Sequence, residues 1–210
     1  MAKTVAIIGG GLQGALAAIA CARRGCDVVL FERRAAILQG ASRNNEGKIH
    51  LGFTYGLDST GETQKLLARY GAAFRPALRE LLGASETSFA LAEEVTYVRR
   101  TDSLLSESAT DRHFEMVARL QNDHGFGPPA MRRLSAAETQ DRFCGPVSSA
   151  HVVSEETIDP KKLCAAVAYA LSLLPNILVK TGVEIDHVTA ANQRKSLRRM
   201  VCARGRSTPS

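Results

Sequence analysis

Tryptophan is absent from this sequence of 210 residues, and aromatic residues make up only 5% of it. So few large rings argue against a surface on which bases or sugars stack. No window approaches the roughly 18 apolar residues of a membrane-spanning helix. The apolar run at residues 4–8 is too short for a secretory signal and lacks a cleavage site. These absences favour a globular cytoplasmic protein that neither spans a membrane nor binds nucleic acid.

The five cysteines lack the spacing of a disulfide framework or a metal site. They are odd in number, none forms a CxxC pair, and none is spaced with histidines like metal ligands. We therefore expect a reducing environment, no bound metal, and a role as small buried apolar side chains for Cys21 and Cys164. The cysteines are Cys21, Cys26, Cys144, Cys164 and Cys202.

Acidic residues are missing from residues 193–210, which contain six arginines and lysines. This segment carries the whole formal net charge of +6, so residues 1–192 are neutral as a group. A neutral body has no electrostatic footprint for nucleic acid. We expect residues 192–210 to form a basic, disordered tail, and a basic arm for an anionic partner is the alternative.

A GxGxxG pattern opens the chain. It follows an apolar run that predicts a strand, leads into a predicted helix, and is completed by a second predicted strand. Gly9 permits a tight turn, Gly11 lets the backbone approach a pyrophosphate, and Gly14 lets the helix lie against the strands. The helix N-terminus offers N–H groups and a positive dipole end to phosphates. The two strands and the helix are predicted at residues 4–8, 27–31 and about 13–24, and the expected diphosphate contacts are Gly9, Gly11, Leu12, Gln13 and Gly14.

Glu32 follows the second predicted strand, 18 residues after Gly14. A carboxylate at this place accepts hydrogen bonds from the adenosine ribose of a dinucleotide. It also disfavours the 2′-phosphate of NADP, although Arg33 and Arg34 beside it weaken that argument. The pattern alone does not separate FAD from NAD.

Residues 40–52 favour FAD. This stretch is polar, small and long, where NAD-binding domains have a plain loop and a second crossover helix. Residues 1–52 resemble the start of the D-amino-acid-oxidase-like (DAO) family of FAD-dependent oxidoreductases, in which a Ser/Thr-Arg-Asn-x-Gly segment lies along the flavin. The resemblance implies FAD as cofactor, with the ADP half held by Gly9, Gly11, Gly14, Glu32 and Arg33. It implies a flavin half lined by Ser42, Arg43, Asn45, Glu46, Gly47 and Ile49.

A second stretch resembles the same family. Residues 157–163, with the sequence TIDPKKL, and residues 176–185 are similar to a helix and a following strand whose valine backbone meets the adenine. The resemblance implies that this residue is Val183. It covers about residues 1–56 and 150–188.

His50 and Tyr55 follow the flavin segment and are the candidates for facing the substrate. A covalent flavin link at either residue is a further option, but the family's attachment positions do not match cleanly. The alternative is a hydrogen-bonded structural histidine and a half-buried tyrosine. No catalytic acid or base is assigned.

The pattern, together with the resemblance, predicts an α/β fold in which a Rossmann-type FAD-binding βαβ unit and its sheet carry an inserted, mainly helical segment. The resemblance implies that the domain is incomplete. Ser59-x-x-Glu62 predicts a capping box before a helix whose apolar positions run from Leu66 and Tyr70 to Leu81. Ser135-x-x-Glu138 predicts a second one. Further strands are expected near 88–91, 95–98, 147–154, 177–179 and 183–188, and helices near 110–124 and 160–174. The expected domains are 1–56 (βαβ unit and flavin loop), 57–150 (insert), 151–191 (return to the sheet) and 192–210 (tail).

The resemblance implies oxidation of a C–N or C–O bond, with hydride passing from a small-molecule substrate to flavin N5. It implies amines or amino acids as substrates, and a 2-hydroxy acid or polyol phosphate is the alternative. Because intact relatives continue further, we expect a truncated chain whose residues from about 192 are out of frame or otherwise foreign. A naturally short protein with a genuine basic tail is the alternative. A catalytically inactive FAD- or ADP-binding remnant and an NAD-linked dehydrogenase are the other functions considered. The sequence does not indicate an oligomeric state.

Overall fold

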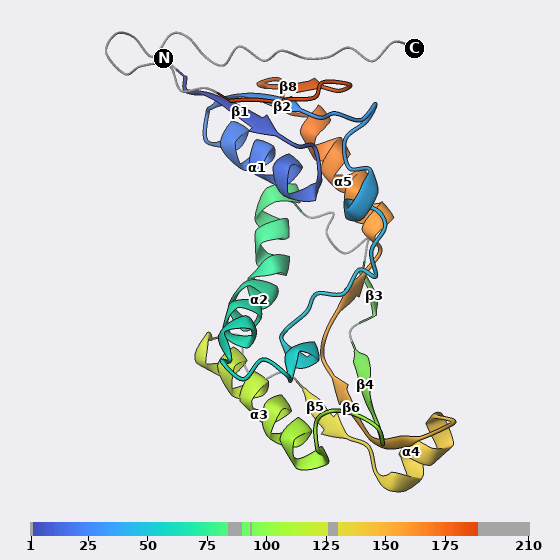
Figure 1. Ribbon diagram of the computed structural model, residues 1–210. Helices are drawn as coiled ribbons and strands as arrows, with labels where there is room; N and C mark the ends of the chain where they lie inside the picture. The colour runs from blue at the N-terminus through green and yellow to red at the C-terminus, as the bar shows by residue number, and fades with distance from the viewer. Residues whose placement is uncertain (1, 84–89, 93, 126–129, 189–210) are drawn as a thin grey trace. The chain divides into compact units, whose positions relative to one another are not determined.

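The computed structural model describes residues 2–83, 90–92, 94–125 and 130–188 of the chain (Figure 1). The described residues form two compact units, the first made of residues 2–45 and 160–188, the second of those that lie between 46 and 159. The expected basic tail, the expected strand start at residues 88 and 89, and Pro128-Pro129 lie outside the described residues.

The first unit is a three-stranded parallel sheet in the order β1-β2-β8. Figure 1 shows two helices on one face of these strands, and the two helices contact each other. The predicted βαβ unit is confirmed, with both strands at their expected bounds, and β8 pairs with β2 at the predicted position. The elements are β1 (Thr4–Ile8), α1 (Leu12–Arg23), β2 (Asp27–Phe31), α5 (Pro160–Ser172) and β8 (Ile177–Lys180).

Small apolar residues let α1 lie close to the sheet. Its buried side chains recur at the spacing of one helix face, and three of the four are alanines. An alanine face allows a short distance between the helix axis and the strands, where Val28 and Leu30 of β2 are also buried. The buried face of α1 consists of Ala15, Ala18, Ile19 and Ala22.

The expected strand at residues 183–188 is wrong. Gly182 adopts a φ of +68°, a left-handed conformation, and turns the chain back along the end of β2. Its N–H donates to the Arg34 carbonyl at 2.9 Å, and the N–H of Val183 donates to the Glu32 carbonyl at 3.0 Å. The backbone donors of Gly182 and Val183 are thus bound to the residues after β2, and residues 183–188 form no regular strand.

The second unit contains an antiparallel sheet in the order β4-β6-β5 together with helices, so the inserted segment holds more strand than the sequence predicts. A two-stranded pair, β3-β7, completes it. Its elements follow the chain from η2 (Phe53–Tyr55) through α2 (Glu62–Leu82), β3 (Ala90–Ala92), β4 (Val95–Arg100), α3 (Glu107–Asp123), β5 (Met131–Arg133), α4 (Ala136–Arg142) and β6 (Val147–Val153) to β7 (Thr157–Ile158).

Aromatic packing forms the core of the second unit. The rings of Phe53 and Phe114 have centroids 5.0 Å apart, and the ring of Tyr97 packs on both. Val153 of β6 is fully buried in the same cluster. This core joins η2, α3, β4 and β6. It holds residues 51–53, which follow the predicted flavin segment, against the rest of the second unit.

The start and the buried face of α2 differ from the expectation. Ser59 does not cap the helix, because the Asp58 carboxylate accepts the N–H groups of Thr60 and Thr63 at 2.9 and 3.0 Å, and Glu62 becomes the first helical residue. Leu66 and Tyr70, expected in the core, are exposed.

The close approach of another segment explains the shifted face. Gln64, Ala68 and Leu78 are the buried positions of α2. A Cβ on Gly71 would lie 2.5 Å from the His50 carbonyl oxygen, so the chain at residue 50 runs directly against this helix.

The second predicted capping box is confirmed. The Ser135 hydroxyl accepts the Glu138 N–H at 3.2 Å, and the Glu138 carboxylate accepts the Ser135 N–H at 2.8 Å. None of the helices in the described part of the chain combines the length and apolar character that crossing a membrane requires.

Candidate functional site: the glycine turn and the segment that follows it

The turn between β1 and α1 requires glycine where its backbone is left-handed or lies against another backbone atom. Gly9 has a φ of +102°, a conformation that favours glycine, and its N–H donates to the Phe31 carbonyl at 2.8 Å. A Cβ on Gly14 would lie 1.9 Å from the Gly9 carbonyl oxygen. The structure therefore gives Gly9 and Gly14 the turning and packing roles that the spacing predicts.

Gly10 is a residue of this turn that the spacing argument missed. A Cβ there would lie 2.7 Å from Ile37 Cγ2 and 3.0 Å from Glu32 Cβ. The Gly10 N–H donates to Glu32 Oε2 at 2.7 Å, and its carbonyl accepts the Leu38 N–H at 2.7 Å. The run of three consecutive glycines is the only sequence signal that points to it.

The start of α1 presents backbone donors. The first helical hydrogen bond is that of the Ala15 N–H to the Gly11 carbonyl at 2.9 Å, so the N–H groups of Leu12, Gln13 and Gly14 have no acceptor within the helix. Gly11 provides no side-chain cap. Such a helix start, with its positive dipole end, suits a phosphate.

Ser42 lies at this helix start. Its hydroxyl oxygen accepts the Leu12 N–H at 2.9 Å, and a Cβ on Gly11 would lie 3.3 Å from the same oxygen. The Ser42 carbonyl in turn accepts the thiol of Cys164, whose pKa is raised by burial. The structure thus brings the first residue of the predicted flavin segment to the mouth of the glycine turn.

Glu32 lies at the end of β2 beside the turn. Its Oε2 accepts from Gly10, as described, and its Oε1 accepts the Arg34 N–H at 2.9 Å. Each carboxylate oxygen retains further capacity to accept, which a ribose hydroxyl would use. The Val183 N–H donates to the Glu32 carbonyl, so the two residues are adjacent. The exposed Arg33 side chain has its Nη1 atom 3.8 Å from Glu184 Oε1. Glu32 and Val183 are therefore neighbours, as the adenine and ribose roles require.

The predicted flavin segment begins with a short 3₁₀ turn, η1 (Gly40–Ser42). The Asn45 side chain closes this turn by donating to the Ala41 carbonyl at 2.8 Å. The Arg43 side chain is exposed. These residues belong to the first unit.

Residues 46–49 belong to the second unit, where they run antiparallel to residues 156–158. The Gly47 carbonyl accepts the Ile158 N–H at 2.8 Å, and the Ile49 N–H donates to the Glu156 carbonyl at 2.9 Å. Gly47 has a φ of +69° and is buried, as is Ile49. The exposed Glu46 carboxylate has a pKa below its usual range because of hydrogen bonds from its own backbone and from His50.

His50 and Tyr55, the candidates for facing a substrate, lie close together. Their ring centroids are 6.3 Å apart in an edge-to-face arrangement. His50 Nε2 lies 3.4 Å from Glu46 Oε1, and His50 Nδ1 lies 3.8 Å from Glu155 Oε1. The partly exposed Tyr55 ring and the half-buried His50 ring keep both a structural and a substrate-facing role open.

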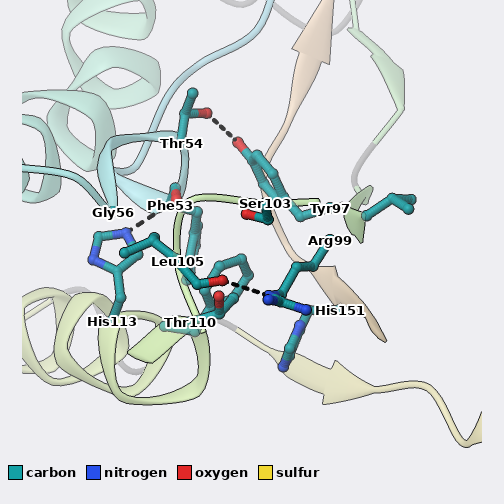
Figure 2. Close-up of a pocket in the computed structure, with 12 residues that line it drawn as sticks. Phe53, Thr54, Gly56, Tyr97, Arg99, Ser103, Leu105, Thr110, His113 and His151 are labelled. Atoms are coloured by element: carbon teal, nitrogen blue, oxygen red, sulfur yellow. Dashed lines mark hydrogen bonds between the residues drawn. The ribbon is translucent and has the colours of Figure 1, made fainter. Parts of the chain in front are cut away.

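A pocket of about 180 Å³ opens in the second unit (Figure 2). Phe53, Tyr97 and Phe114 form its aromatic wall, and Thr54 contributes a hydroxyl 3.0 Å from that of Tyr97. No motif in the sequence predicts that the two histidines of this pocket lie together. Its polar lining includes Arg99, Thr110, His113 and His151.

Both histidines of the pocket have partners. His113 Nε2 lies 3.0 Å from the Phe53 carbonyl, and His151 Nε2 lies 3.0 Å from Asp111 Oδ1. Burial lowers the pKa of His151, and Asp111 opposes that shift. Among the described residues, no group of three His, Cys, Asp or Glu side chains is arranged to hold a metal, and Cys21, Cys26, Cys144 and Cys164 are free thiols.

The residues of the glycine turn fit the ADP half of FAD. The backbone turns where only glycine avoids strain, at Gly9, and has no room for a Cβ at Gly10 or Gly14. Donor N–H groups at the helix start and the Glu32 carboxylate lie at the two ends of this turn. That donor and acceptor set matches a diphosphate and a ribose.

Comparison with known proteins identifies the chain's relatives. The family model described as FAD dependent oxidoreductase (DAO) matches residues 4–205. One component of the anaerobic glycerol-3-phosphate dehydrogenase of Haemophilus influenzae is 28% identical over 166 residues, which are 79% of this chain and 27% of that protein. The chain spans about a quarter of the length of the curated relatives it matches.

Solved structures share the fold. L-Amino acid deaminase from Proteus myxofaciens, in complex with anthranilate, superposes with a TM-score of 0.64 at 23% identity over 90% of this chain and 40% of that one. L-α-glycerophosphate oxidase from Mycoplasma pneumoniae, with FAD bound, gives a TM-score of 0.61 at 19% identity over 89% and 46% of the two chains. With the family model matched over nearly its whole length, the chain belongs to the FAD dependent oxidoreductase (DAO) family, whose cofactor is FAD.

Proposed function

We propose that this chain supplies the FAD-binding part of an oxidase or dehydrogenase that acts on amines or amino acids. The observation that carries the proposal is the hydrogen bond from the Leu12 N–H to Ser42, because it joins the start of the predicted flavin segment to the glycine turn. A protein that binds only a nucleotide would need the glycine turn but not the contact between that turn and Ser42. An NAD-linked dehydrogenase is disfavoured by the family match.

In this proposal the two halves of FAD are held by different groups. The N–H groups of Gly11, Gln13 and Gly14 bind the diphosphate, beside Leu12, whose N–H is held by Ser42. Glu32 binds the ribose, and the Val183 backbone meets the adenine. The flavin side is lined by Ser42, Arg43, Asn45, Glu46, Gly47 and Ile49, and Arg33 adds a positive charge near the ADP half.

When bound, FAD supplies the acceptor for a hydride from the substrate carbon, and the protein supplies position and electrostatics. Backbone N–H groups at the start of α1 neutralise diphosphate charge without a mobile side chain. The left-handed Gly47 and the antiparallel bonds of residues 47–49 hold the flavin-facing backbone in one path. His50 and Tyr55 follow directly, which makes them the candidates for contact with substrate.

Amines and amino acids are the favoured substrates because the chain shares its fold with L-amino acid deaminase. A polyol phosphate is the second candidate, since the glycerol-3-phosphate dehydrogenase component is 28% identical. Both reactions remove a hydride from carbon next to nitrogen or oxygen, and the FAD site proposed here would serve either.

Anaerobic reduction separates these candidates. The purified chain is loaded with FAD, freed of excess cofactor, and mixed under anaerobic conditions with amines and amino acids, then with glycerol 3-phosphate and 2-hydroxy acids. We expect loss of the visible band of oxidised flavin with the first group. Bleaching by the second group alone would transfer the assignment to C–O oxidation, and bound flavin that no substrate reduces would favour a non-catalytic FAD-binding role.

A further inference from the structure

A fully buried carboxylate lies in the second unit. Glu155 follows β6 and has an exposed fraction of 0%. Its Oε1 accepts the Leu51 N–H at 2.6 Å, and its Oε2 accepts the Tyr97 hydroxyl. Burying a carboxylate is costly unless its oxygens are hydrogen-bonded. These hydrogen bonds, rather than packing, therefore account for an acid at this place.

The same carboxylate faces His50. The Nδ1 atom of His50 is buried, has no hydrogen-bond partner among the described residues, and lies 3.8 Å from Glu155 Oε1. The other ring nitrogen faces Glu46, whose side chain is 66% exposed and so is screened by solvent. The buried carboxylate exerts the stronger field on the ring. Of the two tautomers of the ring, this geometry favours the one with the proton on Nδ1, because the other would turn the Nδ1 lone pair toward the carboxylate.

Tyr97 extends this arrangement to the pocket of Figure 2. Its hydroxyl lies 3.0 Å from Thr54 Oγ1, and both residues line the pocket. Burial, followed by the hydrogen bond to Glu155, holds the pKa of Tyr97 well above its usual range. The phenol therefore stays protonated and donates its hydrogen to Glu155.

We propose that Glu155 is a positioning residue for the segment that follows the flavin-facing residues: it anchors the backbone at Leu51, keeps a proton on His50 Nδ1, and ties both through Tyr97 to the pocket wall. The part of this proposal that places His50 beside the flavin rests on the proposed function. The anchoring itself does not.

The first test needs no variant. The ring nitrogens of His50 are observed by ¹⁵N NMR in the full chain at neutral pH, with His50→Gln used to assign the signals. We expect a protonated Nδ1. A neutral ring protonated on Nε2 alone would overturn the proposal, because its lone pair would then face the carboxylate.

The second test compares Glu155→Gln with Glu156→Gln, the same change at the neighbouring acid, which pairs with Arg75. A charge-assisted hydrogen bond is roughly twice as strong as a neutral one, so hydrogen exchange at the Leu51 amide should rise roughly tenfold in Glu155→Gln. Glu156→Gln should leave that amide unchanged. Equal exchange at Leu51 in Glu155→Gln and the unmodified protein would overturn the anchoring role.

FAD addition then separates this proposal from the proposed function. If the unmodified chain binds no FAD, the proposed function fails, and the two tests above still decide the anchoring by Glu155. If FAD binds, we expect the His50 ring signals to shift in the unmodified chain and to shift differently in Glu155→Gln. Bound FAD that leaves the His50 signals in place would overturn the positioning role at the flavin.

Discussion

At the scale of single residues, contact distances around the glycine turn explain more than the glycine spacing does. Gly9 and Gly14 are required by backbone conformation and by helix packing, as their spacing predicts. Gly10 is required by the side chains of Glu32 and Ile37, which no motif encodes. The acid proposed to bind the ribose is thus positioned by Gly10, which occupies a variable position of the GxGxxG pattern.

Replacing Gly10 by alanine should destabilise the chain. The added Cβ meets Ile37 Cγ2 at 2.7 Å and Glu32 Cβ at 3.0 Å, so both neighbours must move. Overpacking of this kind costs about 1–3 kcal/mol of unfolding free energy, measured by urea denaturation. The same change in an Ile37→Ala background should cost less, because one contact is gone. Equal costs in the two backgrounds would show that the clash does not exist.

Ser42→Ala should lower the unfolding free energy by about 1 kcal/mol, the usual cost of losing an acceptor at a helix start. The Leu12 N–H would lose the hydroxyl that it now reaches at 2.9 Å. Ser172→Ala is the control, since that exposed hydroxyl bonds only to the Tyr169 carbonyl of its own helix. A Ser42→Ala variant no less stable than this control would show that Ser42 does not cap α1.

Glu155 and Tyr97 show where residue-level prediction from the sequence ends. Glu155 stands in the run Ser-Glu-Glu, and nothing in the sequence separates it from Glu156. Its burial arises because residues 50–51, β4 and the end of β6 converge on it, and that convergence is set by tertiary structure. The importance of Ser42, by contrast, is predictable, because the segment that it begins resembles the Ser/Thr-Arg-Asn-x-Gly sequence typical of the family.

At the scale of elements, local signals succeed where the chain supplies its own hydrogen-bond partners. The Ser135–Glu138 capping box is predicted and present, because both partners lie within one turn. The Ser59 box fails because Asp58, one residue earlier, accepts two backbone donors and delays the helix. The buried face of α2 escapes prediction because Gly71, not a large apolar residue, meets the neighbouring chain.

The capping box of α4 should make stability sensitive to acid. The Ser135 backbone N–H, followed by Arg132, lowers the pKa of Glu138 from an ordinary value of 4.5 to about 2. The folded state therefore favours the ionised carboxylate, and its contribution is complete above pH 4.5 and is lost as the pH falls through about 2.

Glu138→Gln tests this linkage. The variant has no carboxylate to protonate, so its unfolding free energy should fall less steeply than that of the unmodified chain below pH 4.5. Urea denaturation at several pH values measures the slope. Gln140→Ala, which alters the same helix without touching a carboxylate, should keep the original slope. An unchanged slope in Glu138→Gln would contradict the account.

At the scale of the whole molecule, the sequence predicts the class of fold and the family. The strand content of the second unit is harder to predict from it. The first βαβ unit and the return of β8 follow from apolar runs and glycines. The antiparallel sheet of the second unit includes β5, which is only three residues long, has no buried residue and carries no apolar pattern. Its strand character comes from pairing with β6.

Binding of FAD by the full chain tests the central claim, that the glycine turn and Ser42 together form one end of a dinucleotide site. Glu32→Gln is compared with Glu184→Gln, the same change at an exposed acid that faces Arg33. A hydrogen bond to a charged group contributes about 1.5–3 kcal/mol, so Glu32→Gln should weaken FAD binding roughly tenfold or more. Glu184→Gln should bind FAD as the unmodified chain does.

The most direct measurement is equilibrium dialysis of the purified chain against FAD and, separately, against NAD, with bound cofactor read from its absorption spectrum. We predict one FAD retained per chain, in preference to NAD, with weaker retention in Glu32→Gln and Ser42→Ala. A chain that retains no FAD, or retains NAD more tightly than FAD, would contradict the assignment.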